Sequence, residues 1–176
     1  AGLVPADHAL TINAVSGYSG GGRQMIEAYE VLQTAPAFEL YGLGLTHKHL
    51  PELERYTGLT RRPIFVPSVG NFRQGMLVSV PLHLDTLPGS PSPHDLEQAL
   101  AAHYAGAETV RVVPQGASAA LGGRLDSLGL NGTDKLEVYV FPSGDGRQAL
   151  LVARLDNLGK GAAGAAVQNI RLMLGL

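Results

Sequence analysis

Cysteine is absent from this chain of 176 residues, which excludes disulfide bonds, a thiol nucleophile and thiolate metal ligands. An excess of either charge is also lacking, because 13 basic and 15 acidic residues give a formal net charge of −2. A balanced charge argues against a protein that binds nucleic-acid phosphates, since such proteins usually show a basic patch or a high pI. The apolar runs are only a few residues long, so no transmembrane helix is predicted.

The first residues lack the marks of a targeting segment. Residues 1–7 hold neither a basic stretch nor a long apolar one, and no methionine begins the chain. We therefore expect no signal peptide here, and we interpret this stretch as a connection within a longer chain.

Apolar residues and turn formers are well represented. Hydrophobic residues make up 45% and charged residues 16%, which is too apolar for a disordered chain. The 23 glycines and 11 prolines predict many tight turns and short elements. A chain of this length is expected to form a single domain by default.

Periodicity and turn signals predict a mixture of strands and helices without strict alternation. The strands are expected at 9–16, 38–43, 64–69, 72–84, 109–113, 135–141 and 148–155. The helices are expected at 23–33, near 49–57 with Thr46 as a cap, at 93–105 and at 159–174. Residues 116–132 are expected to be mostly loop. The predicted class is α+β, a mixed, mainly antiparallel sheet with helices packed on one face.

Residues 159–164 match G-x-G-x-x-G literally. A dinucleotide fingerprint needs a following βαβ unit and an acid about 20 residues further on. Only twelve residues follow Gly164, so that interpretation fails. The alternatives are a helix start whose small residues allow close packing, and a helix N-terminus that binds a phosphate or an amide oxygen.

Residues 16–23 join a predicted strand to a predicted helix through a glycine-rich turn that ends in Arg23. The turn is not a P-loop, because no G-K-[ST] follows. It is either a flexible turn or a cradle for an oxyanion or carboxylate, in which backbone N–H groups and Arg23 supply positive charge.

Tyr41, His47, His49 and Glu52 lie within twelve residues. Glu52 follows His49 by about one helical turn, and an acid so placed can orient a histidine that acts as a base. The pair His47 and His49 also suits two metal ligands, although no third ligand is obvious nearby. A third interpretation is that these are surface or structural histidines.

In order along the chain, these segments resemble one family. Residues 16–23 (SGYSGGGR) resemble the SGxSGxGR segment of N-acetyl-γ-glutamyl-phosphate reductases. Residues 41–52, which hold Tyr41, His47, His49 and Glu52, are similar to their Y-x5-H-x-H-x2-E. Residues 65–76 resemble the family segment that follows this motif. Residues 156–161 and 165–169 resemble their closing helix, so the resemblance, which is to the shorter family type, spans nearly the whole chain.

The resemblance implies part of an NADP-dependent enzyme of arginine biosynthesis that converts N-acetyl-γ-glutamyl phosphate to N-acetylglutamate semialdehyde. A cysteine forms a thioester in this family, and that cysteine and the Rossmann domain would precede residue 1. Residues 1–157 would be the substrate-binding and oligomerisation domain, like the C-terminal domain of glyceraldehyde-3-phosphate-dehydrogenase-like enzymes. Residues 158–176 would be a closing helix packed on the nucleotide domain. The implied protein is a cytoplasmic homo-oligomer with a small-molecule substrate, without nucleic acid or membrane, and this chain alone would be inactive.

The resemblance also implies roles for single residues. His49, with His47 second and Glu52 as orienting partner, would carry acid–base catalysis. The substrate would contact Tyr41, Arg23 and Ser19, and the cofactor would contact Asn157, Lys160 and Gly161. No metal is expected. The alternatives are a non-catalytic assembly module and a hydrolase with a metal bound to His47 and His49.

Overall fold

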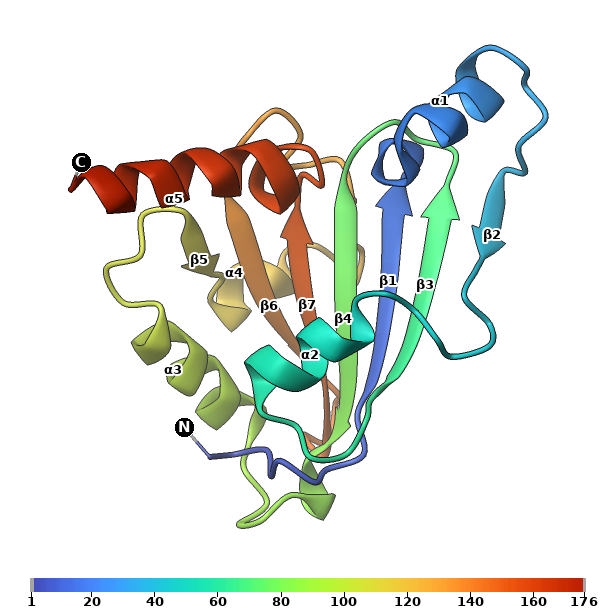
Figure 1. The fold of residues 1–176 in the computed structure, drawn as a ribbon. Helices are drawn as coiled ribbons and strands as arrows, with labels where there is room; N and C mark the ends of the chain where they lie inside the picture. Colours follow the sequence, from blue (N-terminus) through green and yellow to red (C-terminus); the bar gives the residue numbers. More distant parts are fainter. Residues whose placement is uncertain (1, 176) are drawn as a thin grey trace.

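The computed structural model describes residues 2–175. Residue 1 of the predicted domain 1–157 and residue 176 of the predicted closing segment 158–176 lie outside the described residues. Seven strands form one sheet in the order β2-β3-β1-β4-β7-β6-β5 (Figure 1). The pairs β1–β3 and β5–β6 are parallel, and the other four pairs are antiparallel. The predicted class, a mixed and mainly antiparallel sheet with helices, is therefore confirmed.

The strands are β1 (Thr11–Gly17), β2 (Phe38–Leu40), β3 (Ile64–Gly70), β4 (Met76–His83), β5 (Val110–Val112), β6 (Leu136–Pro142) and β7 (Gln148–Leu155). The α-helices are α1 (Gly22–Glu30), α2 (Leu50–Thr57), α3 (Pro93–His103), α4 (Gln115–Ala119) and α5 (Gly164–Leu174). Single 3₁₀ turns, η1 (Tyr18–Gly21) and η2 (Leu84–Thr86), follow β1 and β4. A π-helical stretch, η3 (Gly159–Ala163), leads into α5.

Pairing between β4 and β7 joins two groups of strands. Strands β2, β3, β1 and β4 come from the first half of the chain, and β5 and β6 come from the second half. The last strand, β7, lies between them and pairs with β4 along its whole length, from Met76 with Leu155 to His83 with Gln148. The sheet is thus complete only when the last strand is in place.

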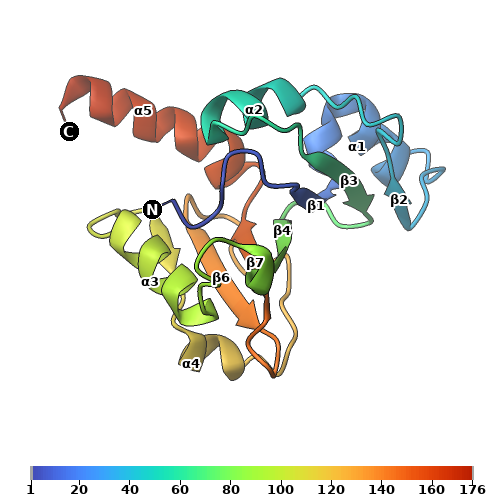
Figure 2. The ribbon, with the colours of Figure 1, turned by 90° about the horizontal axis from the view of Figure 1, so that it is seen from below.

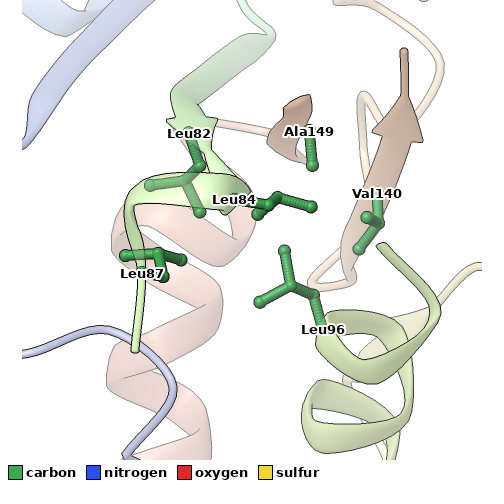
Figure 3. Packing of buried hydrophobic residues seen from close by; sticks show 6 residues of the cluster. All are labelled: Leu82, Leu84, Leu87, Leu96, Val140 and Ala149. Atoms are coloured by element: carbon green, nitrogen blue, oxygen red, sulfur yellow. The ribbon is translucent and has the colours of Figure 1, made fainter. Parts of the chain in front are cut away.

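Helices α2, α3 and α5 lie on one side of the sheet (Figure 2). Alternate residues of β1 point to this side, so that Ile12 and Ala14 are buried with Leu50 of α2. Further along, Leu96 of α3 is buried in a cluster with Leu84 and residues of β4, β6 and β7 (Figure 3). Burial of such a leucine side chain stabilises the fold by about 1.5–3 kcal/mol.

Helix α3 begins where the sequence predicts it. The Ser92 hydroxyl accepts a hydrogen bond from the Asp95 N–H at 3.2 Å, and the Asp95 carboxylate accepts one from the Ser92 N–H at 2.7 Å. This reciprocal cap satisfies two of the donors that a helix start leaves free.

The opposite face is covered at its β6 end, where Val113 and Leu125 flank α4 and pack near Tyr139 and Val152. Glu137 accepts hydrogen bonds there from the Tyr139 hydroxyl at 2.6 Å and from Arg154 Nη2 at 2.6 Å. Burial, the largest effect, raises the pKa of Glu137, but these hydrogen bonds and the charge of Arg154 together lower it below its ordinary value. Burial and the bond to Glu137 raise the pKa of Tyr139 to about 12.

Among the described residues, no helix lies on the rest of this face, and we call it the open face. A shallow cavity of about 520 Å³ lies on it, between the segment after α4 and strand β2. Its apolar lining includes Val15, Val66, Leu77, Leu150, Phe38 and Leu40.

Several boundaries differ from those predicted. Helix α2 begins at Leu50, and its N-cap is His49 without a side-chain cap, so the expectation that Thr46 caps it is wrong. Residues 116–132 are not all loop, because α4 occupies 115–119. The closing helix starts with π-type bonds, from Gly161 N–H to Asp156 O and from Ala163 N–H to Leu158 O. Within residues 2–175, no helix has the length and apolar character needed to cross a membrane.

Candidate functional site

The glycine-rich turn predicted to be a cradle forms the first wall of a pocket at the end of β1. Backbone N–H groups of Gly17, Tyr18 and Ser19 donate to the carbonyls of Gly75, Phe72 and Arg73 at 2.9, 2.9 and 3.0 Å. A side chain at Gly17 would collide with the carbonyl of Arg73, because an added Cβ would lie 2.6 Å from that oxygen. The glycine therefore lets the turn lie against residues 72–75.

The segment before α2 forms the second wall and carries both histidines. The His47 ring lies among Tyr41, His49 and Phe65, with ring centroids 5.5, 4.8 and 5.0 Å away. Its Nδ1 accepts a hydrogen bond from the backbone N–H of His49 at 3.2 Å.

This hydrogen bond defines the protonation of His47. A backbone N–H only donates, so Nδ1 is the acceptor and the neutral ring carries its proton on Nε2. Burial first, then the positive charges of His49 and Lys48, lower the pKa of His47 below its ordinary value. Near neutral pH, His47 is therefore a neutral hydrogen-bond donor through Nε2.

The third wall is the segment between β7 and α5. Asn157 uses both ends of its amide: Nδ2 donates to Ser19 Oγ at 3.0 Å, and Oδ1 accepts from the Gly75 N–H at 2.8 Å. This residue thus holds the glycine-rich turn and the loop before β4 together.

Asp156 belongs to the same wall and is buried, with 1% of its surface exposed. Its carboxylate accepts hydrogen bonds from the Gly132 N–H at 2.7 Å, the Leu158 N–H at 2.9 Å and Gln74 Nε2 at 2.9 Å. Burial, the largest effect, raises its pKa, but the hydrogen bonds together outweigh burial and hold the pKa below its ordinary value.

The three walls enclose a cavity of about 440 Å³, which we call the histidine pocket. Six of the nine predicted site residues line it: Ser19, Tyr41, His47, His49, Asn157 and Gly161. Burial raises the pKa of Tyr41, so its hydroxyl remains a donor. The Ser19 hydroxyl, which accepts from Asn157, keeps its own hydrogen for a ligand.

The other three predicted site residues lie outside the lining of the pocket. Arg23 is exposed in the first turn of α1, and Glu52 is exposed in the first turn of α2. No hydrogen bond or ion pair between Glu52 and His49 is found within residues 2–175. Lys160 points toward β5, where its ammonium group donates to Thr109 Oγ1 at 2.8 Å and to Gln168 Oε1.

Two of the three glycines of residues 159–164 are explained by close packing. A Cβ at Gly159 would collide with the carbonyl of Thr133, and one at Gly164 would lie 2.8 Å from Cβ of Asp134. This supports the interpretation of the motif as a helix start. Within residues 2–175, no group of three His, Asp or Glu side chains suits a metal ion, so the hydrolase alternative gains no support.

Sequence reasoning assigned no role to Asp156, Gln74 or Lys48. Asp156 and Gln74 fall within the motif segments 156–161 and 65–76, and their partners lie in loops whose positions the sequence does not reveal. Lys48 lines the pocket between the two histidines. Its position within H-x-H was the available signal.

The fold and pocket define a class of protein, and comparison with known proteins agrees. Residues 1–157 match the family described as "Semialdehyde dehydrogenase, dimerisation domain", so the chain belongs to this family. A probable aspartate-semialdehyde dehydrogenase from Pseudomonas aeruginosa shares the fold, with a TM-score of 0.63 and 19% identity over 94% of this chain and 55% of that one.

Curated relatives are closer in sequence. The chain is 54% identical to N-acetyl-gamma-glutamyl-phosphate reductase of Rhizobium etli over 99% of its length and 57% of the relative. It is 50% identical to N-acetyl-gamma-glutamyl-phosphate reductase 2 of Pseudomonas putida, again over 99% of this chain and 56% of the relative. The chain therefore spans little more than half the length of these relatives.

Proposed function

We propose that this chain is the substrate-binding and oligomerisation part of an NADP-dependent, cytoplasmic reductase that converts N-acetyl-γ-glutamyl phosphate to N-acetylglutamate semialdehyde. The observation that carries the proposal is the convergence of three distant segments, each similar to a reductase segment, in the histidine pocket. Identity of 50–54% to enzymes of that name over 99% of the chain supports the same conclusion.

The reaction needs a nucleophile that this chain does not contain. In the proposed enzyme, a cysteine thiolate from a nucleotide-binding domain attacks the acyl carbon, and the C–O bond to phosphate breaks to leave a thioester. NADPH, when bound, supplies the hydride that reduces this thioester to the aldehyde and frees the thiolate. The histidine pocket holds the acyl group for these steps.

The two histidines suit different tasks. His47, neutral and protonated on Nε2, is suited to donate a hydrogen bond to the carbonyl oxygen as that oxygen gains negative charge. His49 is exposed at the pocket and contributes only its backbone N–H to the bond with His47, so its ring is free to move a proton. We assign acid–base catalysis to His49 and propose that Glu52 orients it when substrate binds.

At the histidine pocket, few groups of this chain are available to bind a dinucleotide cofactor. Gly161 lines the pocket without a side chain, which leaves room for a flat ring. Asn157 uses its amide to hold the pocket wall together, and Lys160, outside the lining, uses its ammonium group on Thr109 and Gln168. The main cofactor contacts are assigned to the nucleotide-binding domain.

Two apolar surfaces suit larger partners. On α5, Val167, Ile170 and Leu174 are 51%, 56% and 66% exposed, as expected for a closing helix that packs on a nucleotide-binding domain. The open face of the sheet suits a second copy of the chain, in line with a dimerisation domain.

The test is phosphate-dependent reduction of NADP by N-acetylglutamate semialdehyde. The chain alone is expected to be inactive, and the chain mixed with a folded, NADP-binding domain that carries the cysteine is expected to turn over. Turnover by the chain alone would contradict the thioester mechanism. Inactivity of the mixture, with both parts folded, would favour a non-catalytic assembly module.

A further inference from the structure

The lining of the histidine pocket is electrostatically one-sided. Among the described residues, no Asp or Glu lines it, and Lys48 is the only Lys or Arg that does. Every other polar group of the lining is a hydroxyl, an amide, a histidine or the peptide backbone. A cavity with one fixed positive charge and no fixed negative charge favours an anion.

Lys48 differs in this respect from the other cations considered for the site. Lys160 is held by Thr109 and Gln168, and Arg23 lies outside the pocket lining. Within residues 2–175, the ammonium group of Lys48 makes no hydrogen bond or ion pair. Its three donors therefore remain available to a ligand.

We propose that Lys48 is the anion-binding residue of the histidine pocket and contacts an oxyanion of the substrate. This takes over the role that the sequence assigned to Arg23. The nature of the oxyanion rests on the proposed function, which offers two: the α-carboxylate and the phosphoryl group of N-acetyl-γ-glutamyl phosphate. A lysine suits either, because its compact charge is attracted to both.

Binding to the chain itself tests this proposal, with backbone amide chemical shifts of the pocket residues as the readout. The two probes are inorganic phosphate, and N-acetylglutamine, whose sole anionic group is the α-carboxylate. The variant Lys48→Met removes the charge, Lys48→Arg keeps it, and Lys135→Met is the matched control on an exposed site outside the pocket.

At least one probe is expected to bind the wild-type chain, and Lys48→Met is expected to weaken its binding about tenfold. Lys48→Arg is expected to retain most of the affinity, and Lys135→Met all of it. The probe that binds Lys48→Met more weakly than the wild type identifies the substrate oxyanion that Lys48 contacts. Equal binding by wild type and Lys48→Met, or no saturable shift at the pocket with either probe, would overturn the proposal.

This experiment separates the proposal from the proposed function. Lys48-dependent binding together with an inactive reconstituted enzyme would contradict only the reductase assignment. An active enzyme whose chain binds both probes equally well with and without Lys48 would contradict only the role of Lys48.

Discussion

The side-chain amide of Asn157 donates a hydrogen bond to the hydroxyl of Ser19, which lies 138 residues earlier in the chain. The two residues belong to different motifs, and the second hydrogen bond of Asn157, from the Gly75 N–H, adds a third segment. The pocket wall is therefore fixed by one side chain that satisfies groups on two distant turns.

Replacing Asn157 with Ala is expected to destabilise the chain by about 1–3 kcal/mol, because the Gly75 N–H loses its partner. Urea denaturation checks this value. Asn169→Ala, at an exposed position of α5, is the control and is expected to change stability by less than about 0.5 kcal/mol. Equal stability of both variants would show that water replaces the amide of Asn157.

Asp156→Asn is expected to cost about 2–4 kcal/mol near neutral pH, since the carboxylate loses hydrogen bonds and an amide N–H faces donors. The folded-state pKa lies below the unfolded one, so the stabilisation is present above about pH 4 and is lost as the pH falls through the folded value. Denaturation curves against pH should thus show the wild type and the variant converging below about pH 4. A constant gap would argue against the charged form, and Asp7→Asn is the exposed control.

His47 is expected to show a protonated Nε2 and an unprotonated Nδ1 in nitrogen NMR spectra, and to titrate below the ordinary value of about 6.5. His47→Phe, which keeps an aromatic ring beside Phe65, identifies the resonances by their loss. A ring protonated on Nδ1 at neutral pH would contradict the division of roles between the two histidines.

Arg154→Met is expected to destabilise the chain by about 1.5–3 kcal/mol, because the carboxylate of Glu137, 15% exposed, loses its hydrogen-bonded cation and keeps only the more distant Arg111 at 4.0 Å. Arg147→Met removes an exposed ion pair with Asp85 and is expected to cost less than about 1 kcal/mol. Thermal or urea unfolding distinguishes the two. In the wild type, absorbance titration of Tyr139 should show ionisation only near pH 12.

Leu150→Glu is expected to weaken self-association, because Leu150 lies on the open face and is 38% exposed. Sedimentation velocity should show a shift toward the monomer with little change in helix content. Tyr56→Glu, on the outer side of α2 and 82% exposed, is the control. Association unchanged by Leu150→Glu would place the interface elsewhere.

The positions of helices and strands were predicted well where they depend on adjacent residues. The start of α3 at residue 93, the end of α2 at residue 57 and the positions of β6 and β7 were each predicted from a few adjacent residues. The start of α2 was predicted to within one residue, but the predicted Thr46 cap was wrong because no side chain caps this helix. Helix α4 was missed because five residues give no periodicity.

For the site, the motifs predicted which segments matter but not how single side chains point. Arg23 and Lys48 are both cations within a motif, but the turn before α2 brings Lys48 to the pocket while Arg23 lies outside the lining. The direction of Lys160 depends on Thr109 and Gln168, and Thr109 lies 51 residues earlier in the chain. Such distant contacts leave no local pattern.

The position of β7 has a consequence for biosynthesis. This strand follows both of its neighbours in the chain and must insert between β4 and β6, so both have an unpaired edge until β7 has been synthesised. Contacts this distant in sequence slow folding, and exposed edges invite aggregation. A nascent chain that stops before residue 148 has two separate groups of strands and no third wall for the pocket, so ligand binding can begin only after β7 and the segment that follows it have been synthesised.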